Sequence, residues 1–289
     1  MQMPEVKVAF QGARGAFSEA ASRAILPGRQ LLFETCETFF ETFSALDSGT
    51  VDYAVVPIEN TLHGSVHENY DHLLQFQPSI LAETQVRIVH NLIGRPESTI
   101  RKINCAISHP VALAQCLEFF RRHPEIRAES HYDTGGSVKT VMEGEDPALG
   151  AVASSVAAEY YGAKILEASI EDDHANFTRF FLLGRQGSTF EEPKRRRKTS
   201  LVFVTPNRPA ALFKSMAAFA LRDINMTKIE SRPIKGRPFE YSFYMDILGD
   251  PSETNCANAM RHLEETTESL SVLGCYTPAR IPAHDGQHG

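Results

Sequence analysis

The first two thirds of the chain alternate short apolar runs with segments of helical periodicity. Residues 6–10 have the composition of a buried strand, and residues 16–26 that of a helix that ends at Pro27-Gly28. Thr38 is placed to cap a second helix, which ends near Gly49. Further strands are expected at 53–56 (closed by Pro57), 103–108 (followed by a helix with Pro110 in its first turn), 126–132, 149–153 and 177–183. The alternation predicts a parallel α/β sheet with helices on both faces.

The composition of the sequence changes near Gly187. Residues 187–198 are polar, charged and interrupted by Pro193, which is typical of a linker. The basic residues 194–198 resemble a nucleic-acid signal, but a solvated linker is favoured in a chain of net charge -7. Beyond it the pattern is strand (200–205), helix (209–221), strand (225–232), strand (241–248), helix (253–267) and strand (269–276). This βαββαβ order predicts an antiparallel α+β unit, and its exposed edge favours pairing with a second copy.

Composition and charge argue against several classes of protein. A net charge of -7 on 289 residues is unfavourable for general nucleic-acid binding. No apolar run approaches the roughly 20 residues that span a bilayer, and the first residues lack the basic and apolar regions of a signal peptide. The five cysteines include no C-x-x-C spacing, so we expect reduced thiols. These features predict a cytoplasmic protein without nucleic-acid or membrane partners.

Small polar residues follow several predicted strands of the first region. They are Gln11-Gly12 with Arg14, Glu59-Asn60-Thr61, Ser108-His109-Pro110, Thr134-Gly135-Gly136-Ser137 and Ser154-Ser155. In open α/β sheets, ligands bind beyond the carboxyl ends of the strands, where helix N-termini offer free N–H groups to anions. Plain helix capping is the alternative explanation for each group taken alone. Together they favour a site for a small anion.

The segment 176–180 places a hydroxyl beside a guanidinium, Thr178-Arg179, within an apolar run. A buried charge is costly without an ionic partner. Arg179 is therefore expected either to face a cleft and meet an anion, with Thr178 nearby, or to pair internally with Asp172 or Asp173. The residues alone leave both alternatives open.

Signals for metal or cofactor binding are weak. His63, His67 and His72 lie near one another, but their spacing matches no zinc motif, and solvated or capping histidines are favoured. A P-loop, a dinucleotide fingerprint and a G-x-S-x-G elbow are all absent from the sequence. We expect a cleft that carries hydroxyls, amides, Glu59 and Arg179, with no metal and no cofactor. Proton-assisted chemistry on a small anion and ligand binding by a two-lobed protein both fit this inventory.

Five separated segments, in this order, resemble prephenate dehydratase joined to a C-terminal ACT regulatory domain. They are Gln11-Gly12 to Ser18, residues 56–61, residues 107–110 with Gln115, residues 176–180 and residues 230–233. The resemblance spans about residues 6–276. It implies an α/β catalytic region of the two-lobed type 2 periplasmic-binding-protein fold, followed by an α+β (ferredoxin-like) ACT domain. The implied boundaries are 1–186 for the catalytic region (lobe one about 1–82 and 168–186, lobe two about 83–167), 187–198 for the linker, 199–280 for the ACT domain and 281–289 for a tail.

This resemblance implies the conversion of prephenate to phenylpyruvate, water and carbon dioxide in L-phenylalanine biosynthesis, without a cofactor. Thr178 would donate a hydrogen bond or proton to the leaving ring hydroxyl, backed by a donor that the sequence does not identify. The other catalytic residues would be Glu59, Asn60, Ser108 and Gln115. The substrate-binding residues would be Arg179, Phe180, Thr61, His109, Thr134, Gly135, Gly136 and Ser137. Because the first strand begins close to Met1, a monofunctional enzyme without a chorismate mutase domain is expected.

The resemblance also implies allosteric control by L-phenylalanine, bound between paired ACT domains of a homodimer or a dimer of dimers. The implied effector-binding residues are Asn207, Pro209, Ala210, Ala211, Leu212, Glu230, Ser231, Arg232 and Pro233. The family usually has glycine where this chain has Ala210. A methyl group at a close backbone approach would weaken effector binding.

Two rival functions remain. Arogenate dehydratase performs the same chemistry on an amino-acid analogue of prephenate. Residues 64–71 and 112–116 resemble the sequences of plant arogenate dehydratases. A non-catalytic amino-acid sensor would use the lobes only for binding. The hydroxyl of Thr178 and the segment 59–61 argue against the sensor, because a sensor needs no proton donor.

Overall fold

The computed structural model describes residues 5–190 and 196–279. These residues form two compact units: the first comprises the described parts of Met1–Phe76 and Thr84–Leu182, and the second Gln77–Glu83 and the described parts of Leu183–Arg280. Residues 77–82, which the sequence assigns to the first lobe, and Glu83, which it assigns to the second, group with the second unit. The predicted tail 281–289 and residues 191–195 of the predicted linker lie outside the described residues.

The first sheet of unit one has the strand order β2-β1-β3-β11-β5. Its strands are β1 (Glu5–Gln11), β2 (Gln30–Cys36), β3 (Tyr53–Asn60), β5 (Ser79–Arg87) and β11 (Phe177–Gly184), with a two-residue β4 (Gly64–Ser65) beside β3. β1 pairs in parallel with both β2 and β3. The helices are α1 (Phe17–Ile25), α2 (Phe39–Asp47) and α3 (His67–Phe76). Thr38 caps α2 as predicted, whereas β3 continues through Pro57 and carries Glu59 and Asn60 within the sheet.

The second sheet of unit one has the order β10-β6-β9-β7-β8. Its strands are β6 (Asn91–Gly94), β7 (Cys105–Ser108), β8 (Arg127–Ser130), β9 (Leu149–Ala153) and β10 (Lys164–Glu167). β7 runs parallel to β8 and β9, but β6 is antiparallel to β9 and β10. The expectation of an entirely parallel sheet is therefore wrong. β6 enters this sheet directly from β5, a strand of the first sheet, and not through a β-α-β unit within the second sheet.

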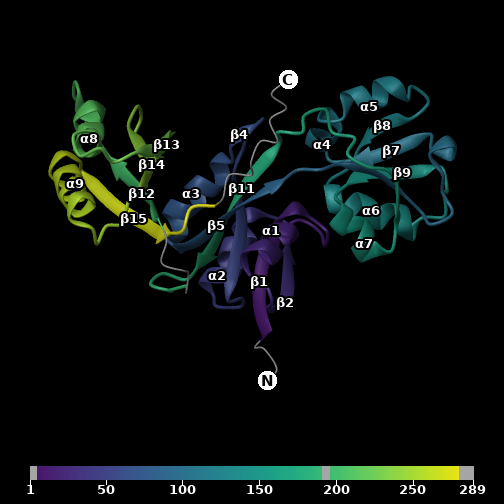
Figure 1. The fold of residues 1–289 in the computed structure, drawn as a ribbon, viewed down its shortest axis with the longest axis horizontal. Helices are drawn as coiled ribbons and strands as arrows, with labels where there is room; N and C mark the ends of the chain where they lie inside the picture. The colour runs from purple at the N-terminus through teal and green to yellow at the C-terminus, as the bar shows by residue number, and fades with distance from the viewer. Residues whose placement is uncertain (1–4, 191–195, 280–289) are drawn as a thin grey trace. The chain divides into compact units, whose positions relative to one another are not determined.

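Helices cover both faces of this second sheet, as predicted. Alternate side chains of β9 enter different cores: Val152 packs with Phe119, and Ala151 packs with Val138. The helices α4 (Pro110–Ala114) and α5 (Leu117–Arg122) lie on one side, and α6 (Thr134–Glu143) and α7 (Ser155–Tyr161) on the other (Figure 1). A short 3-10 helix, Ile100–Lys102, precedes β7.

The second unit has the predicted βαββαβ order. It consists of β12 (Lys198–Val204), α8 (Ala211–Ala220), β13 (Met226–Pro233), β14 (Tyr241–Leu248), α9 (Thr254–Thr266) and β15 (Ser269–Tyr276). The strands form an antiparallel sheet of order β13-β14-β12-β15. Both helices pack on one face of this sheet, where Phe203 and Met245 contact Phe219 and Leu263 (Figure 1). Among the described residues, no helix is long and apolar enough to cross a bilayer.

Candidate active site

A cavity of about 580 Å³ lies in unit one. Its walls come from the ends of β1, β3 and β11, from the segment that follows β5, and from the first residues of α1, α4 and α6. Of the predicted catalytic and substrate-binding residues, seven line it: Asn60, Gln115, Thr178, Phe180, His109, Thr134 and Gly135. A cavity therefore lies where a ligand was expected, beyond the carboxyl ends of strands in the sheet.

The Thr178 side chain is held by Asn60. The Asn60 Oδ1 atom accepts hydrogen bonds from the backbone N–H groups of Leu62 (2.9 Å) and His63 (3.0 Å), which turns its Nδ2 atom toward β11. That nitrogen donates to Thr178 Oγ1 at 2.9 Å and to Asn176 Oδ1 at 2.7 Å. Because Thr178 Oγ1 accepts from the amide, its own proton remains for an acceptor in the cavity. The hydroxyl is thereby oriented as a hydrogen-bond donor.

Arg179 does not share this cavity. Consecutive side chains of a strand point to opposite faces. Thr178 and Phe180 line the cavity, whereas the Arg179 guanidinium lies 4.8 Å from the ring centroid of Phe181, with Nη1 3.9 Å from Glu59 Oε2. The expected cleft-facing hydroxyl–guanidinium pair is therefore corrected, and Glu59 also lies outside the cavity lining.

The alternative prediction, an ion pair between Arg179 and Asp172 or Asp173, is not supported either. The Asp172 carboxylate accepts from the backbone N–H groups of Leu117 (2.8 Å) and Glu118 (2.9 Å) at the start of α5. Asp173 accepts from the N–H of Ala175 at 2.7 Å. The acid beside the Arg179 guanidinium is Glu59.

Gln115 joins two histidines at the cavity wall. Its Nε2 donates to His63 Nε2 at 2.7 Å, and its Oε1 faces His90 Nε2 at 2.8 Å. His90 is 2% exposed, and its ring lies edge-on to Phe17. Burial lowers the pKa of His90, although the Gln115 hydrogen bond and the Glu171 carboxylate oppose this effect, so a neutral imidazole is favoured. The sequence offers no signal for His90, which lies within an apolar run, and His63 was expected to be solvated.

Several predicted site residues bond to the backbone instead of facing the cavity. The Ser108 hydroxyl donates to the carbonyl of Val152 at 2.6 Å, and that of Ser137 to the carbonyl of Thr134 at 2.6 Å. The Thr61 hydroxyl donates to the carbonyl of Ala175 at 2.9 Å. Together with Gly136, these residues lie outside the cavity lining, so the expectation that they contact the ligand is corrected. Buried hydroxyls are costly when unpaired, and nearby carbonyls satisfy them here.

Two helix N-termini face the cavity. Ala16, Phe17 and Ser18 line it from α1, and Thr134 and Gly135 line it from α6. The first N–H groups of a helix have no acceptor within that helix and carry partial positive charge, which suits them to anions. No described lysine or arginine lines the cavity, and its one carboxylate belongs to Asp133, which caps α6.

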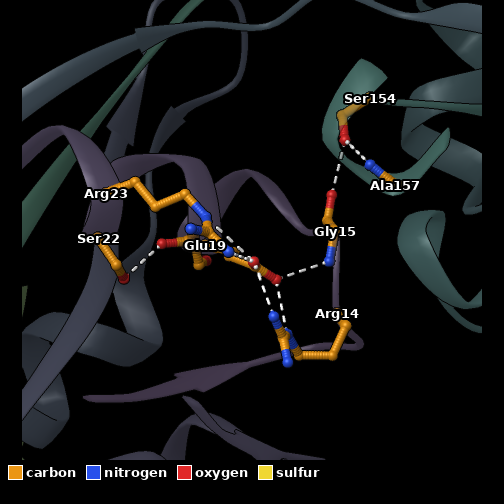
Figure 2. A network of polar contacts seen from close by, with 8 residues as sticks. Arg14, Gly15, Glu19, Ser22, Arg23, Ser154 and Ala157 are labelled. Atoms are coloured by element: carbon orange, nitrogen blue, oxygen red, sulfur yellow. Dashed lines mark hydrogen bonds and ion pairs between the residues drawn. The ribbon is translucent and has the colours of Figure 1, made fainter. Parts of the chain in front are cut away.

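A buried carboxylate fixes the turn ahead of α1. Glu19 accepts hydrogen bonds from Arg14 Nε (2.8 Å), the Gly15 N–H (2.9 Å) and Arg23 Nη2 (2.6 Å), as Figure 2 shows. Burial by itself would raise the pKa of Glu19, but these hydrogen bonds outweigh it and lower the pKa to about 2. The turn also reaches α7, because the Gly15 carbonyl accepts from the Ser154 hydroxyl at 2.6 Å (Figure 2).

Gly15 is required at this contact. Its φ is +84°, and an added Cβ would lie 2.4 Å from the Cα of Ala157. Ser154 caps α7 by accepting from the N–H of Ala157 at 3.1 Å. The first turn of α1 is therefore positioned from two sides, by Glu19 and by α7.

A family model for prephenate dehydratase matches residues 8–188 of the chain. The chain belongs to the prephenate dehydratase family. It is 40% identical over 280 residues to arogenate dehydratase/prephenate dehydratase 2 of Arabidopsis thaliana (94% of this chain, 72% of the relative) and 39% identical over 285 residues to arogenate dehydratase 2 of Petunia hybrida (94% and 71%). Its fold is similar to that of a prephenate dehydratase in complex with L-Phe from Arthrobacter aurescens, with a TM-score of 0.84, 28% identity and coverage of 94% of this chain and 90% of that one. It is also similar to a quorum-quenching acylase, GqqA, with a TM-score of 0.86, 34% identity and coverage of 95% and 98%.

Membership of this family makes the chain a lyase-type enzyme of aromatic amino-acid biosynthesis. The solved relatives confirm the fold class, a mixed α/β structure of the periplasmic-binding-protein type. The Arabidopsis relative is named as chloroplastic, and the cytoplasmic location of this chain stays a prediction.

The second unit holds a smaller cavity of about 310 Å³. Among the predicted effector-binding residues, Asn207, Ala210, Ala211 and Leu212 line it. Ala210 has a φ of +63°, the left-handed region that favours glycine, which agrees with the glycine usual in the family.

The remaining predicted effector residues lie outside this cavity. Pro209 is absent from its lining, and Glu230, Ser231, Arg232 and Pro233 form the end of β13. The predicted enclosure of the effector by both segments, between paired subunits, stays a prediction. Phe239 and Tyr241 line the cavity instead; they follow β13 in the sequence but carry no motif that marks them.

Proposed function

We propose that this enzyme catalyses the decarboxylating dehydration of prephenate or of its amino-acid analogue arogenate. The observation that carries the proposal is the Thr178 hydroxyl, which accepts from Asn60 Nδ2 at 2.9 Å and keeps its proton for the cavity. An oriented donor beside two helix N-termini suits a substrate with two carboxylates and a hydroxyl to lose.

The chemistry balances without an oxidant or a reductant. As the bond between the ring and its carboxylate breaks, its electron pair moves into the ring and expels the hydroxide from the opposite ring carbon, which completes the aromatic ring. The departing hydroxide takes up one proton to become water. Prephenate and one proton give phenylpyruvate, water and carbon dioxide, whereas arogenate gives phenylalanine. The proposal therefore needs no cofactor.

The protein must assist the leaving hydroxide and hold the two carboxylates. Thr178 donates to the leaving oxygen, and assistance of this kind contributes roughly 10²–10⁴-fold to the rate. Asn60 and Gln115 position Thr178 and the ring, while the N-termini of α1 and α6 bind carboxylate oxygens. Phe180 and His109 complete the contacts with the ring. Glu59 and Arg179 support β11 from its other face.

Substitution of Thr178 tests this role. Thr178→Ala should lower kcat by two or more orders of magnitude and change KM only several-fold, because the hydrogen bond strengthens chiefly in the transition state. Thr178→Ser keeps the hydroxyl and should retain most of the activity. Rates are followed by the ultraviolet absorbance of phenylpyruvate from prephenate and by chromatography of phenylalanine from arogenate.

Two results would contradict the proposal. A rise in KM at unchanged kcat would make Thr178 a binding residue only. Tight binding of either substrate without any product would favour the non-catalytic sensor.

Amide hydrolysis is a second candidate, because the fold is similar to that of the quorum-quenching acylase. Phe17, Phe39 and Val66 give the cavity an apolar wall that suits an acyl chain. Release of fatty acid from acyl-homoserine lactones, measured beside the dehydratase assay, separates the two activities.

We propose further that L-phenylalanine regulates the enzyme by binding to the second unit, in a homodimer or a dimer of dimers. The Arthrobacter relative was solved with L-Phe, and four predicted effector residues line the cavity of this unit. Isothermal titration with L-phenylalanine, together with activity measured in its presence, tests the proposal. Ala210→Gly is the matched variant, because it removes the methyl group and its strain. Absence of both heat and inhibition in the two proteins would refute regulation.

A further inference from the structure

We propose that Asp133 is a specificity-determining residue whose carboxylate pairs with the ammonium group of arogenate, so that the amino acid is preferred over the keto acid. This inference rests on the proposed function, and it names the substrate among the two that the function allows.

The position of Asp133 gives its carboxylate two different surroundings. As the N-cap of α6, it accepts from the N–H of Gly136 through Oδ1. Its Oδ2 faces Gly12, which follows β1, since a Cβ added at Gly12 would lie 3.1 Å from it. Capping therefore uses one oxygen and leaves the second directed toward the segment that leads to α1.

The charge of Asp133 is not neutralised by the protein. No ion pair joins it to any described lysine, arginine or histidine. Arg14, whose carbonyl oxygen approaches Gly135, directs its guanidinium to Glu19 and to the ring of Tyr160, 4.3 Å away. No lysine or arginine among the described residues lines the cavity. The N-terminus of α6 stabilises this half-buried carboxylate but does not neutralise it, so the carboxylate can pair with a cationic group of a ligand.

The two substrates differ at one group of the side chain, and that group carries a positive charge in only one of them. Both have two carboxylates and a ring hydroxyl, but arogenate carries an ammonium group where prephenate has a ketone. Prephenate would bring two negative charges to a cavity that already holds the carboxylate of Asp133. Arogenate would offer its ammonium to Asp133 Oδ2 and its neighbouring carboxylate to the N–H groups of Thr134 and Gly135.

Helix capping alone does not require this charge. Asn and Ser cap helices as well as Asp does, and α6 would gain the same hydrogen bond to Gly136 from either. A neutral cap would also avoid the repulsion of an anionic substrate. The hydrogen bond of the cap does not depend on the charge, so the carboxylate can serve a ligand as well.

The variant Asp133→Asn separates the two roles, because asparagine keeps the cap and removes the charge. We expect kcat/KM for arogenate to fall roughly 10- to 100-fold, the effect of a lost charge-assisted hydrogen bond. We expect kcat/KM for prephenate to stay level or to rise several-fold. Asp133→Ser, which also caps, should give the same change if the asparagine variant fails to fold. Asp146→Asn is the matched control, since Asp146 caps a turn outside the cavity by accepting from the N–H of Ala148, and it should leave both values unchanged.

The ratio of the two kcat/KM values decides the inference. A wild-type preference for arogenate that collapses in Asp133→Asn, with prephenate activity retained, supports it. An equal loss on both substrates, or an unchanged ratio, overturns the inference and leaves the dehydratase function standing. A wild-type protein without activity on either substrate overturns the proposed function as well.

Discussion

The two helix N-termini at the cavity are built in opposite ways. At α1 the N-cap is Ala16, which has no side chain able to cap, and the nearest carboxylate, Glu19, is buried and neutralised by two arginines. At α6 the N-cap is Asp133, whose carboxylate lies in the cavity wall. The first terminus leaves its N–H groups to a ligand. The second combines N–H groups with a negative charge, an arrangement that suits the ammonium and carboxylate of an amino acid.

The difference shows how one cavity can receive both ends of a substrate with mixed charge. A bare N-terminus favours a carboxylate, and an acidic cap nearby favours a cation. Apart from the control Gly28→Ala, each variant below disturbs the N-terminus of α1 and leaves the cap of α6 in place. These variants therefore test what the N-terminus of α1 contributes to substrate binding.

The largest effect is expected from Gly15→Ala. The added methyl group would lie 2.4 Å from the Ala157 Cα at a φ of +84°, so it combines left-handed strain with a backbone clash. We expect a loss of about 3–5 kcal/mol in the free energy of unfolding, measured by urea denaturation, and a displaced α1 with much higher KM for both substrates.

Gly28→Ala is the matched control for this substitution. Gly28 has a φ of +73° but nothing within 4 Å of an added Cβ, so it carries the strain without the clash. It should cost only about 1–2 kcal/mol and leave KM unchanged. Equal losses in the two variants would show that the contact between the turn and α7 is unimportant.

Sequence-based prediction succeeded for features that depend on local patterns and failed for features that depend on tertiary structure. The helix cap at Thr38 and the βαββαβ order depend on local patterns, and both were predicted. Thr178 and Asn60 were predicted from a motif, and they share a hydrogen bond. Arg179 was misplaced because two neighbours on a strand were expected to face the same side, which the twofold period of a strand forbids.

Other features had no local signal. His90 reaches the cavity only because β5 and β6 are connected there, and it is surrounded in the sequence by apolar residues. The role proposed for Asp133 depends on the absence of a lysine or arginine among the described residues of the cavity wall, which the sequence cannot show. The antiparallel β6 likewise depends on how the chain passes between two sheets.

A smaller effect is expected from Glu19→Gln. Glutamine keeps the volume but removes the charge that accepts from Arg14, Arg23 and Gly15. The pKa of about 2 for a carboxyl group with an ordinary value of 4.5 corresponds to about 3 kcal/mol of stabilisation. We expect a loss of that order in the free energy of unfolding at pH 7, together with a several-fold rise in KM.

The pH dependence of stability provides an independent readout for Glu19. Because the folded pKa is lowered, the stabilisation is complete above the unfolded pKa near 4.5 and is lost as the pH falls toward about 2. The free energy of unfolding of the wild type minus that of Glu19→Gln should therefore shrink between pH 4.5 and 2. A constant difference across this range would show that the carboxylate does not hold the turn through its charge.

The smallest change in stability is expected from Ala16→Asp. This variant also gives the most direct test of the comparison between the N-termini of α1 and α6. The backbone of Ala16 is extended, with φ of −61° and ψ of 157°, so an aspartate there would cap α1 and make it resemble α6. The cap should add about 1 kcal/mol to the free energy of unfolding, while the new carboxylate competes with the substrate for the same N–H groups. We expect KM to rise roughly tenfold for both substrates, with kcat retained, in steady-state assays. Ala16→Ser, a neutral cap, should give the gain in stability with a smaller rise in KM, since it brings no charge. A more stable Ala16→Asp variant with unchanged KM would show that the substrate does not use the N-terminus of α1, and the contrast between the two helix ends would then lose its functional meaning.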